Sequence, residues 1–157
     1  MSRTVLVISG PNLAALGSRQ PEIYGTLTLA EVSERLVEQG EALGLGCRCL
    51  QSDDEGQIVG WLHEAAETGA DVVLNPAAFT HYSYAVADAC AHAVARGSRL
   101  IEVHLSNPSA REGFRQVSVV TPVATGTIAG FGAQSYFLAL QALANGVRAD
   151  AAGRAAG

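Results

Sequence analysis

The chain has 157 residues, of which 48% are hydrophobic and 16% are charged, so it can bury a substantial core. Its formal net charge of −5 and its lack of a basic run argue against nucleic acid or anionic membrane as a partner. It contains no lysine, which excludes catalysis through a lysine Schiff base. No apolar stretch has transmembrane length and no signal-peptide pattern begins the chain, so we expect a cytoplasmic protein.

We expect one domain over residues 1–147. Residues 148–157 are rich in Ala, Gly and Arg and lack periodicity, so we expect a flexible C-terminal tail there. Cys47, Cys49 and Cys90 are odd in number and contain no CxxC pair, which favours reduced core thiols over disulfides or metal ligands.

The first elements expected are a buried strand and, after a long loop, a helix. The apolar run at 4–8 is typical of a strand that is covered on both faces. Residues 10–25 form a loop punctuated by glycines. A capping box at 28–31 begins the helix, and apolar residues at helical spacing lead to its end at Gly44 or Gly46.

The middle of the chain repeats this alternation. Residues 47–50 are expected to form the second strand, and a second capping box at 52–55 begins a helix that extends towards Thr68. The apolar residues 72–74 form the third strand, and an alanine-rich helix follows a polar loop and covers 84–95.

The last two strands are expected at 100–103 and 117–120, and the last helix at 133–145. Strands that alternate with helices predict an α/β fold, a doubly wound five-stranded parallel sheet with helices on both faces. Ligands of such sheets bind beyond the carboxyl ends of the strands, near the point where the strand order reverses.

Two residues of the 10–25 loop, Arg19 and Tyr24, could carry unusual chemistry. A guanidinium near a phenol favours tyrosinate and makes tyrosine a usable general base. Long loops are more often lids or binding loops than plain connections, and Pro21 and Gly25 indicate a loop of defined shape. The alternative is a solvated arginine beside a tyrosine that packs for rigidity.

Polar side chains gather where the almost purely apolar strands are expected to end. Glu102 and His104 lie two residues apart and therefore point to the same face of their strand. A buried carboxylate beside a histidine is costly unless the two pair, and this pairing makes His104 the best candidate general acid. A purely structural ion pair is the alternative. The gathered residues are Asn12, Asn75, His81, Glu102, His104, Ser106 and Asn107.

Two members of this set have simpler explanations. Asn75, which precedes Pro76, is explained equally well by turn formation and by ligand binding. His81 could equally be a residue at a helix entry, with Thr80 or Ser83 as the cap.

Two arginines, Arg111 and Arg115, lie four residues apart and would share one face of a helix. One of them could hold a substrate carboxylate through two parallel hydrogen bonds. One could instead simply pair with Glu112 or Asp88.

Motifs for cofactors and metals are missing from the sequence. The glycines of 126–132 are in the wrong order for a dinucleotide-binding motif, and no phosphate-binding P-loop occurs. The four histidines lack the spacing of metal ligands, and His63 and His92 fall within helical patterns and are expected at the surface. We therefore expect neither a cofactor nor a metal.

Five motifs follow one another between Val5 and Leu143: GPNL…LG.R.PEIYG, N-P-x-A-x-T-H-x-S, EVHLSN, AR-E-x-FR and G-F-G-A-Q-x-Y-x-x-AL. Together they resemble type II 3-dehydroquinate dehydratases. The resemblance implies a flavodoxin-like fold and the shikimate-pathway dehydration of 3-dehydroquinate to 3-dehydroshikimate, by anti elimination through an enolate and without metal or cofactor. It also implies a homo-oligomer in which trimers assemble into a dodecamer.

The same resemblance implies catalytic roles. Tyr24 would take the C2 proton of the substrate, while Arg19 would favour its ionised form and stabilise developing charge. Asn12 would help to hold a water against the enolate oxygen. His104 would give a proton to the departing hydroxyl, with Glu102 orienting it.

The resemblance further implies that the substrate is bound by Asn75, His81, Leu105, Ser106 and Arg115. Asp88 matches a position that reaches into the site of a neighbouring subunit, so the assembly would be functional. The chain departs from the usual family pattern at Ala14, Phe79, Tyr82, Ala87 and Val119. Among these, Tyr82 is bulkier than the usual residue beside His81 and could crowd the pocket.

The alternative function is a flavodoxin-like module that binds a phosphate or a flavin without catalysis. Such a module predicts a phosphate loop rich in Ser, Thr and Gly after the first strand, and GPNLAALGSR is a poor version of one. Only Trp61 and a few other aromatic residues could stack on a flavin.

Overall fold

The structure is a computed structural model that describes residues 2–146. The expected tail at 148–157 and the side chain of Tyr24 lie outside the described residues. None of the described helices is long and apolar enough to cross a membrane.

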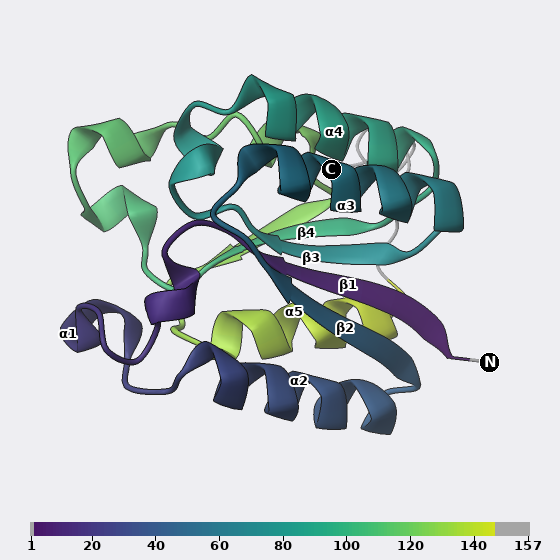
Figure 1. The fold of residues 1–157 in the computed structure, drawn as a ribbon, viewed down its shortest axis with the longest axis horizontal. Helices are drawn as coiled ribbons and strands as arrows, with labels where there is room; N and C mark the ends of the chain where they lie inside the picture. Colours follow the sequence, from purple (N-terminus) through teal and green to yellow (C-terminus); the bar gives the residue numbers. More distant parts are fainter. Residues whose placement is uncertain (1, 147–157) are drawn as a thin grey trace.

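One five-stranded parallel sheet forms the centre of the molecule, with the strand order β2-β1-β3-β4-β5 (Figure 1). This order reverses direction between β1 and β3, which is the arrangement of flavodoxin-like folds. The predicted fold class is therefore confirmed. The strands are β1 (Arg3–Ser9), β2 (Leu45–Gln51), β3 (Asp71–Asn75), β4 (Leu100–His104) and β5 (Gly126–Ala129).

The long helices cover both faces of the sheet. In Figure 1, α3 (Glu55–Thr68) and α4 (Tyr84–Ala95) lie above it, and α2 (Leu29–Ala42) and α5 (Gln134–Ala144) lie below it. A short helix, α1 (Pro21–Tyr24), lies within the loop after β1. The 3-10 segments are η1 (Leu13–Ala15), η2 (Ala77–His81), η3 (Pro108–Ala110), η4 (Gly113–Gln116) and η5 (Thr121–Val123).

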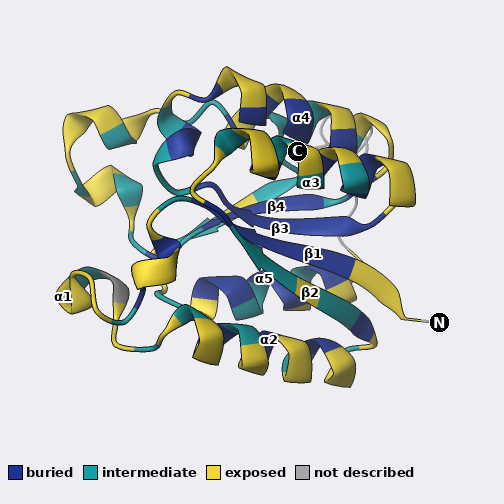
Figure 2. Cartoon of the chain, in the orientation of Figure 1, coloured by how far each residue is buried: buried dark blue, intermediate teal, exposed yellow. Residues whose placement is uncertain are grey.

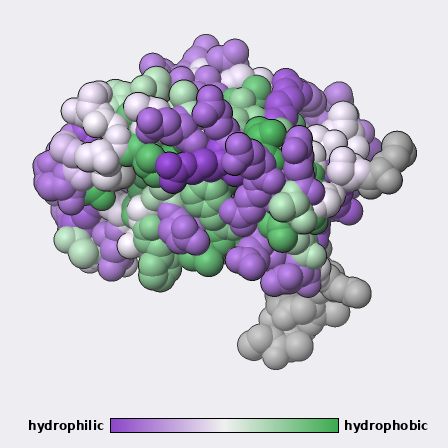
Figure 3. All heavy atoms as spheres, turned by 90° about the horizontal axis from the view of Figure 1, so that it is seen from below, coloured by the Kyte–Doolittle hydropathy of each residue, from purple (hydrophilic) through white to green (hydrophobic). Residues whose placement is uncertain are grey.

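The core has two halves because successive side chains of a strand point to opposite faces. In β1, Val5 and Val7 pack towards α2 and α5, whereas Leu6 and Ile8 pack towards α3 and α4. Figure 2 shows buried residues along the central strands and exposed residues on the outer sides of the helices. Figure 3 views the molecule from the side of α2 and α5, where hydrophilic and hydrophobic residues are interspersed. The central strands are thus covered on both faces, as their apolar sequences predict.

The predicted start of the first long helix is confirmed. The Thr28 hydroxyl accepts a hydrogen bond from the Glu31 amide, and the Glu31 carboxylate accepts one from the Thr28 amide. Gly44, with φ of 77°, follows the helix in the left-handed conformation that favours glycine.

The predicted capping box at 52–55 is wrong by two residues. The Ser52 hydroxyl accepts from the Asp54 amide, and the Asp54 carboxylate caps α3 by accepting from the Gly56 amide at 2.8 Å. Aspartate caps a helix as well as serine does, so the stretch from Ser52 to Glu55 offers more than one start.

The predicted fifth strand at 117–120 is also wrong, because β5 is Gly126–Ala129. The amides of Val120 and Thr121 bond to the Ser118 hydroxyl at 3.2 and 3.0 Å. This apolar run therefore folds into a turn held by a side chain instead of a strand.

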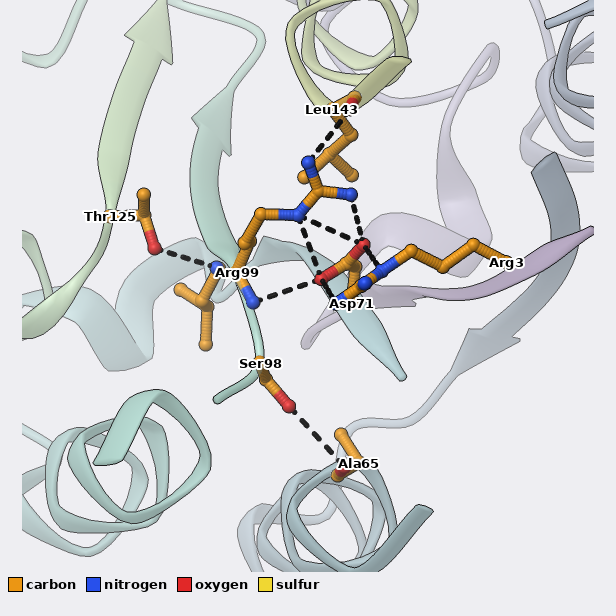
Figure 4. A network of polar contacts seen from close by, with 8 residues as sticks. Arg3, Ala65, Asp71, Ser98, Arg99, Thr125 and Leu143 are labelled. Carbon is orange, nitrogen blue, oxygen red and sulfur yellow. Dashed lines mark hydrogen bonds and ion pairs between the residues drawn. The ribbon is translucent and has the colours of Figure 1, made fainter. Parts of the chain in front are cut away.

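An ion cluster around a buried carboxylate closes the amino-terminal end of the sheet (Figure 4). The carboxylate of Asp71, which is fully buried, pairs with Arg3 and Arg99, each at 2.5 Å. Arg99 also donates to the Leu143 carbonyl at the end of α5. Burial raises the pKa of Asp71, but hydrogen bonds from Arg99 and Arg3 outweigh it and hold the pKa below its usual range.

Candidate active site

A pocket lies at the opposite edge of the sheet, beyond the carboxyl ends of β1, β3 and β4. This is where doubly wound sheets bind their ligands. Asn12, Arg19, Asn75, His81, His104 and Ser106 all line it, so the structure brings most of the predicted site residues together. The remaining lining residues are Pro11, Leu13, Leu16, Ala77, Ala78, Leu105, Pro108, Arg111 and Arg115.

The start of the 10–25 loop crosses closely over the end of β3. The Gly10 amide donates to the Asn75 carbonyl at 2.8 Å, and a Cβ at Gly10 would lie 2.9 Å from the Pro76 carbonyl oxygen. Asn12 has a left-handed backbone with φ of 69°, and its amide donates to the Asp53 carboxylate at 2.9 Å. Asp53, which follows β2, was missed from the sequence because its partner lies on a different loop.

In the rest of this loop, residues 17–26, the two ends are in contact. Gly17, with φ of 95°, approaches Thr26 so closely that a Cβ would lie 2.9 Å from the Thr26 carbonyl oxygen. Between them, α1 carries Tyr24, and the exposed Arg19 lines the pocket. The relation between the Arg19 and Tyr24 side chains stays a prediction.

Asn75 serves both a turn and the pocket, so its two interpretations do not compete. Its side-chain oxygen accepts from the Ala77 amide, where the backbone has a positive φ of 50°. Its side-chain nitrogen donates to the fully buried Tyr136 hydroxyl at 3.1 Å, and Tyr136 is 2.8 Å from the Ser9 hydroxyl. Burial raises the pKa of Tyr136 to about 12. A neutral phenol thus orients the Asn75 amide from below the pocket.

Glu102 and His104 form the pair that their spacing predicts. Glu102 is fully buried, and its Oε2 lies 2.6 Å from His104 Nε2. Burial raises the pKa of Glu102, but the hydrogen bond and charge of His104 and the bonds from Thr121 and Thr80 outweigh it, so the pKa lies below its usual range. The carboxylate is therefore ionised and the histidine Nε2 donates to it.

Three hydroxyl groups that sequence reasoning missed surround this carboxylate. Thr80, Ser118 and Thr121 all donate to Glu102. The signal was present, because a buried carboxylate needs several donors and one histidine does not satisfy it. Which residues supply them depends on loops that only the tertiary structure brings together.

His81 lies at the end of η2, and its Nδ1 donates to the Val117 carbonyl at 2.7 Å. The cap of α4 is Ser83, whose hydroxyl accepts from the Val86 amide. Of the two predicted caps, Ser83 is confirmed, and Thr80 contacts Glu102 instead.

Arg111 and Arg115 do not share one helix face, because η3 ends before Arg111 and η4 contains Arg115. Both nevertheless line the pocket. Arg115 pairs with Glu112 at 2.5 Å, as the simpler interpretation predicts, and Arg111 donates to the Ser106 hydroxyl at 3.4 Å. Arg19 lines the same pocket, so three arginines reach it, of which Arg115 has its charge offset by Glu112.

The remaining predicted site residues occupy different positions. Leu105 is buried in the pocket wall, whereas Asn107 caps η3 from outside the lining. Asp88 is exposed on α4 and is not among the residues that line this pocket. Tyr82, which could crowd the pocket, is 58% exposed and packs edge-on against Phe79 instead.

A flavin site needs aromatic rings that can stack on the flavin, and a metal site needs several side chains that can bind the metal. Trp61 lies on α3, and the described lining of the pocket contains no Trp, Tyr or Phe that could stack on a flavin ring. Within residues 2–146, no three His, Cys, Asp or Glu side chains converge as metal ligands would. His63 and His92 are exposed, as predicted, and the described cysteines are free thiols.

Known proteins of one family match this chain over nearly its whole length. The family model described as dehydroquinase class II matches residues 3–144. The 3-dehydroquinate dehydratase of Salinispora tropica is 56% identical, with 89% of this chain and 96% of the relative covered. That of Halalkalibacterium halodurans is 51% identical, with 91% and 97% covered.

Solved structures agree with this match. The crystal structure of type II dehydroquinase from Propionibacterium acnes superposes with a TM-score of 0.88 at 50% identity, covering 92% of this chain and 98% of that one. The type II dehydroquinase from Butyrivibrio crossotus gives 0.87 at 40% identity, with 92% and 98% covered. The chain therefore belongs to the class II dehydroquinase family.

Proposed function

We propose that this chain is a hydro-lyase that converts 3-dehydroquinate to 3-dehydroshikimate, a step of the shikimate pathway. Relatives named 3-dehydroquinate dehydratase share about half of its residues over almost its full length. The pocket chemistry independently fits a small anionic substrate that must lose a hydroxyl group.

One observation carries the proposal: a histidine that is hydrogen-bonded to a buried carboxylate lines the same pocket as three arginines. His104, bonded to Glu102, can give a proton to a leaving hydroxyl. Arg19, Arg111 and Arg115 line the same pocket and can hold a carboxylate. A proton donor beside an anion site suits the dehydration of a hydroxy acid.

The proposed reaction is an anti elimination in two steps. Tyrosinate at Tyr24 takes the C2 proton, and the electron pair of that bond moves into the ketone to form an enolate. Arg19 favours the ionised phenol, and Asn12 helps to hold a water against the enolate oxygen. The enolate then restores the ketone as the bond to the β-hydroxyl breaks, and the hydroxyl leaves as water with a proton from His104.

The other pocket residues would position the ring. Asn75 and His81 would contact substrate hydroxyls, and the backbone and side chain at Leu105 and Ser106 would hold the carboxylate together with Arg115. Because His81 Nδ1 donates to a backbone carbonyl, its neutral ring would present Nε2 to the pocket as an acceptor for a hydroxyl.

Assembly into a homo-oligomer, as trimers that form a dodecamer, belongs to the proposal. Exposed apolar side chains support it, because Tyr84, Phe114 and Val117 are 73%, 62% and 61% exposed. Asp88 would then contact the site of a neighbouring subunit. A cytoplasmic location likewise stays a prediction.

The direct test is to incubate the purified protein with 3-dehydroquinate and follow the ultraviolet absorbance of the conjugated enone product. We expect the absorbance to rise. If no signal appears at high enzyme concentration, the proposed activity is wrong.

The proposed base is tested separately with Tyr24→Phe. This variant should lose turnover while it still binds substrate, since the ring remains and only the phenol oxygen is removed. Nearly normal turnover would refute Tyr24 as the base. Borohydride added with substrate should not inactivate the wild-type protein, because the chain has no lysine to form a Schiff base.

A further inference from the structure

The carboxylate of Glu102 receives more hydrogen bonds than an orienting role for one histidine requires. Its Oε2 accepts from His104 at 2.6 Å, from Ser118 at 3.3 Å and from Thr80, and its Oε1 accepts from Thr121 at 2.5 Å. Carboxylates accept on both oxygens, and this fully buried one has hydrogen-bond contacts with four side chains.

The direction of these hydrogen bonds is set by the backbone. The Ser118 hydroxyl accepts from the amides of Val120 and Thr121, which occupy its lone pairs. Its single hydrogen must therefore point towards Thr80, at 2.6 Å, or towards Glu102. The Thr80 hydroxyl in turn donates to Glu102. The hydrogens of Thr80 and Thr121 thus point to the carboxylate, and the hydrogen of Ser118 points to it directly or through Thr80.

We propose that Thr80, Ser118 and Thr121 are positioning residues that hold Glu102 as an acceptor-only carboxylate, so that His104 keeps its Nε2 proton against Glu102 and gives the leaving hydroxyl the proton of its other ring nitrogen. This inference rests on the proposed role of His104 as the general acid.

Proton transfer from Nε2 of His104 to Oε2 of Glu102 would weaken this arrangement. The proton would stay on the line between these two atoms, but the hydroxyls would then donate to a neutral carboxyl instead of a carboxylate. Hydrogen bonds to a charged acceptor are stronger than those between neutral groups, so the transfer would cost part of each one. The three hydroxyls therefore oppose the transfer and favour a charged pair.

The same contacts connect the acid to the substrate-binding segments. Thr80 directly precedes His81, and its carbonyl accepts from the Val119 amide at 2.7 Å. The 118–121 turn follows η4, which carries Arg115. The hydroxyl donors thus fix the two loops around one carboxylate.

Other titratable and charged groups face the pair from the neighbouring elements. On α4, burial and the charge of Glu102 raise the pKa of Cys90 to about 12, so this group is a neutral thiol. The Glu102–His104 pair is faced by His81 from η2 and by Arg115 from η4. Arg19 and Arg111 lie across the pocket. The variants below leave all these groups in place.

The test is the pH dependence of kcat for Thr121→Val in the full oligomer with 3-dehydroquinate. Thr121 is exposed, so valine should be tolerated by the fold. Loss of one donor makes the pair hold its proton more tightly. We expect the alkaline limb of the profile to move up by about one pH unit and the plateau kcat to fall about tenfold. Thr121→Ser keeps the donor and should restore the wild-type profile.

Thr127→Val is the matched control. Thr127 sits opposite Glu102 in the β4–β5 register and lines the same space, and the described residues show no hydrogen bond between them. Its profile should match the wild type, and Ser118→Ala should shift in the same direction as Thr121→Val. If the wild type is active and the pH profile of Thr121→Val is not shifted, this inference is wrong and the proposed function still stands. A wild type without turnover overturns the proposed function as well.

Discussion

Two fully buried carboxylates lie in the sheet, and they are neutralised in different ways. Asp71, at the start of β3, pairs with Arg3 and Arg99. Glu102, nearer the carboxyl end of β4, pairs with His104 and with hydroxyl groups. Both carboxylates are fully buried, but the number and the chemistry of their partners differ.

The difference separates a structural charge cluster from a chemical one. Arginine does not give up its proton in proteins, so the charges around Asp71 are permanent and can only stabilise the fold. Histidine exchanges its proton near neutral pH, so the cluster around Glu102 can hold a proton and release it. A buried charge alone therefore does not identify an active site, whereas the identity of its partner does.

The largest expected effect is on turnover, from His104→Asn. Loss of a general acid should lower kcat about 10²–10⁴-fold. The buried Glu102 keeps its hydroxyl donors, so the free energy of unfolding should fall by less than in Asp71→Asn. Steady-state kinetics and denaturant unfolding of the same preparation measure the two effects. If the variant keeps more than a tenth of wild-type kcat, His104 is not the general acid of the reaction.

Asp71→Asn should give the opposite result. Two guanidinium groups would lose their buried partner, and the free energy of unfolding should fall by about 3–5 kcal/mol. Turnover by the folded protein at low temperature should stay normal, because Asp71 lies at the far end of the sheet from the pocket. Lost turnover with unchanged stability would contradict the contrast between the two clusters.

Acid should weaken both clusters, and the pKa directions set the range of pH. The folded pKa values of Asp71 and Glu102 lie below the ordinary values of 3.8 and 4.5. Between the folded and unfolded pKa values the unfolded chain binds more protons, so stability falls as the pH falls. We expect each contribution to be complete above its ordinary value and lost as the pH drops through the folded value.

Thermal unfolding between pH 7 and pH 2 measures this loss. Asp71→Asn should flatten the acid part of the stability curve, since its own contribution is already missing. A variant curve that runs parallel to the wild type throughout would show that Asp71 does not contribute to acid unfolding.

The smallest effect is expected for a surface ion pair. Arg48 and Glu64 are paired, but their side chains are 50% and 38% exposed. Glu64→Gln should change the free energy of unfolding by at most about 1 kcal/mol, because water screens the pair. Denaturant unfolding of Glu64→Gln and Asp71→Asn under the same conditions checks this. If both variants lose a similar free energy of unfolding, burial does not determine how much an ion pair stabilises the fold.

The fold was predictable where one local pattern determined each element. The apolar runs of β1 and β3 and the capping box of α2 need no distant contact to be recognised. The error at 117–120 has a different cause, because Ser118 binds the backbone amides that a strand would use. The β5 sequence, by contrast, begins with a glycine and gives a weak strand signal.

The shorter the sequence distance between two site residues, the better their contact could be predicted. Glu102 and His104 are two residues apart, so strand periodicity alone places them together. Tyr136 orients Asn75 across 61 positions, and no local pattern connects those two side chains. The hydroxyls around Glu102 are hidden for the same reason, since their loops meet only in the folded chain.

The close approach of Gly17 to Thr26 has a consequence for protein engineering. A segment whose two ends touch can be exchanged as a unit, since the scaffold on either side needs no adjustment to the length between them. Leu16, immediately before it, is buried and anchors the scaffold side. Grafting residues 17–26 between relatives would therefore transfer Arg19 and Tyr24 together, and would give chimaeras that compare loops on one unchanged core.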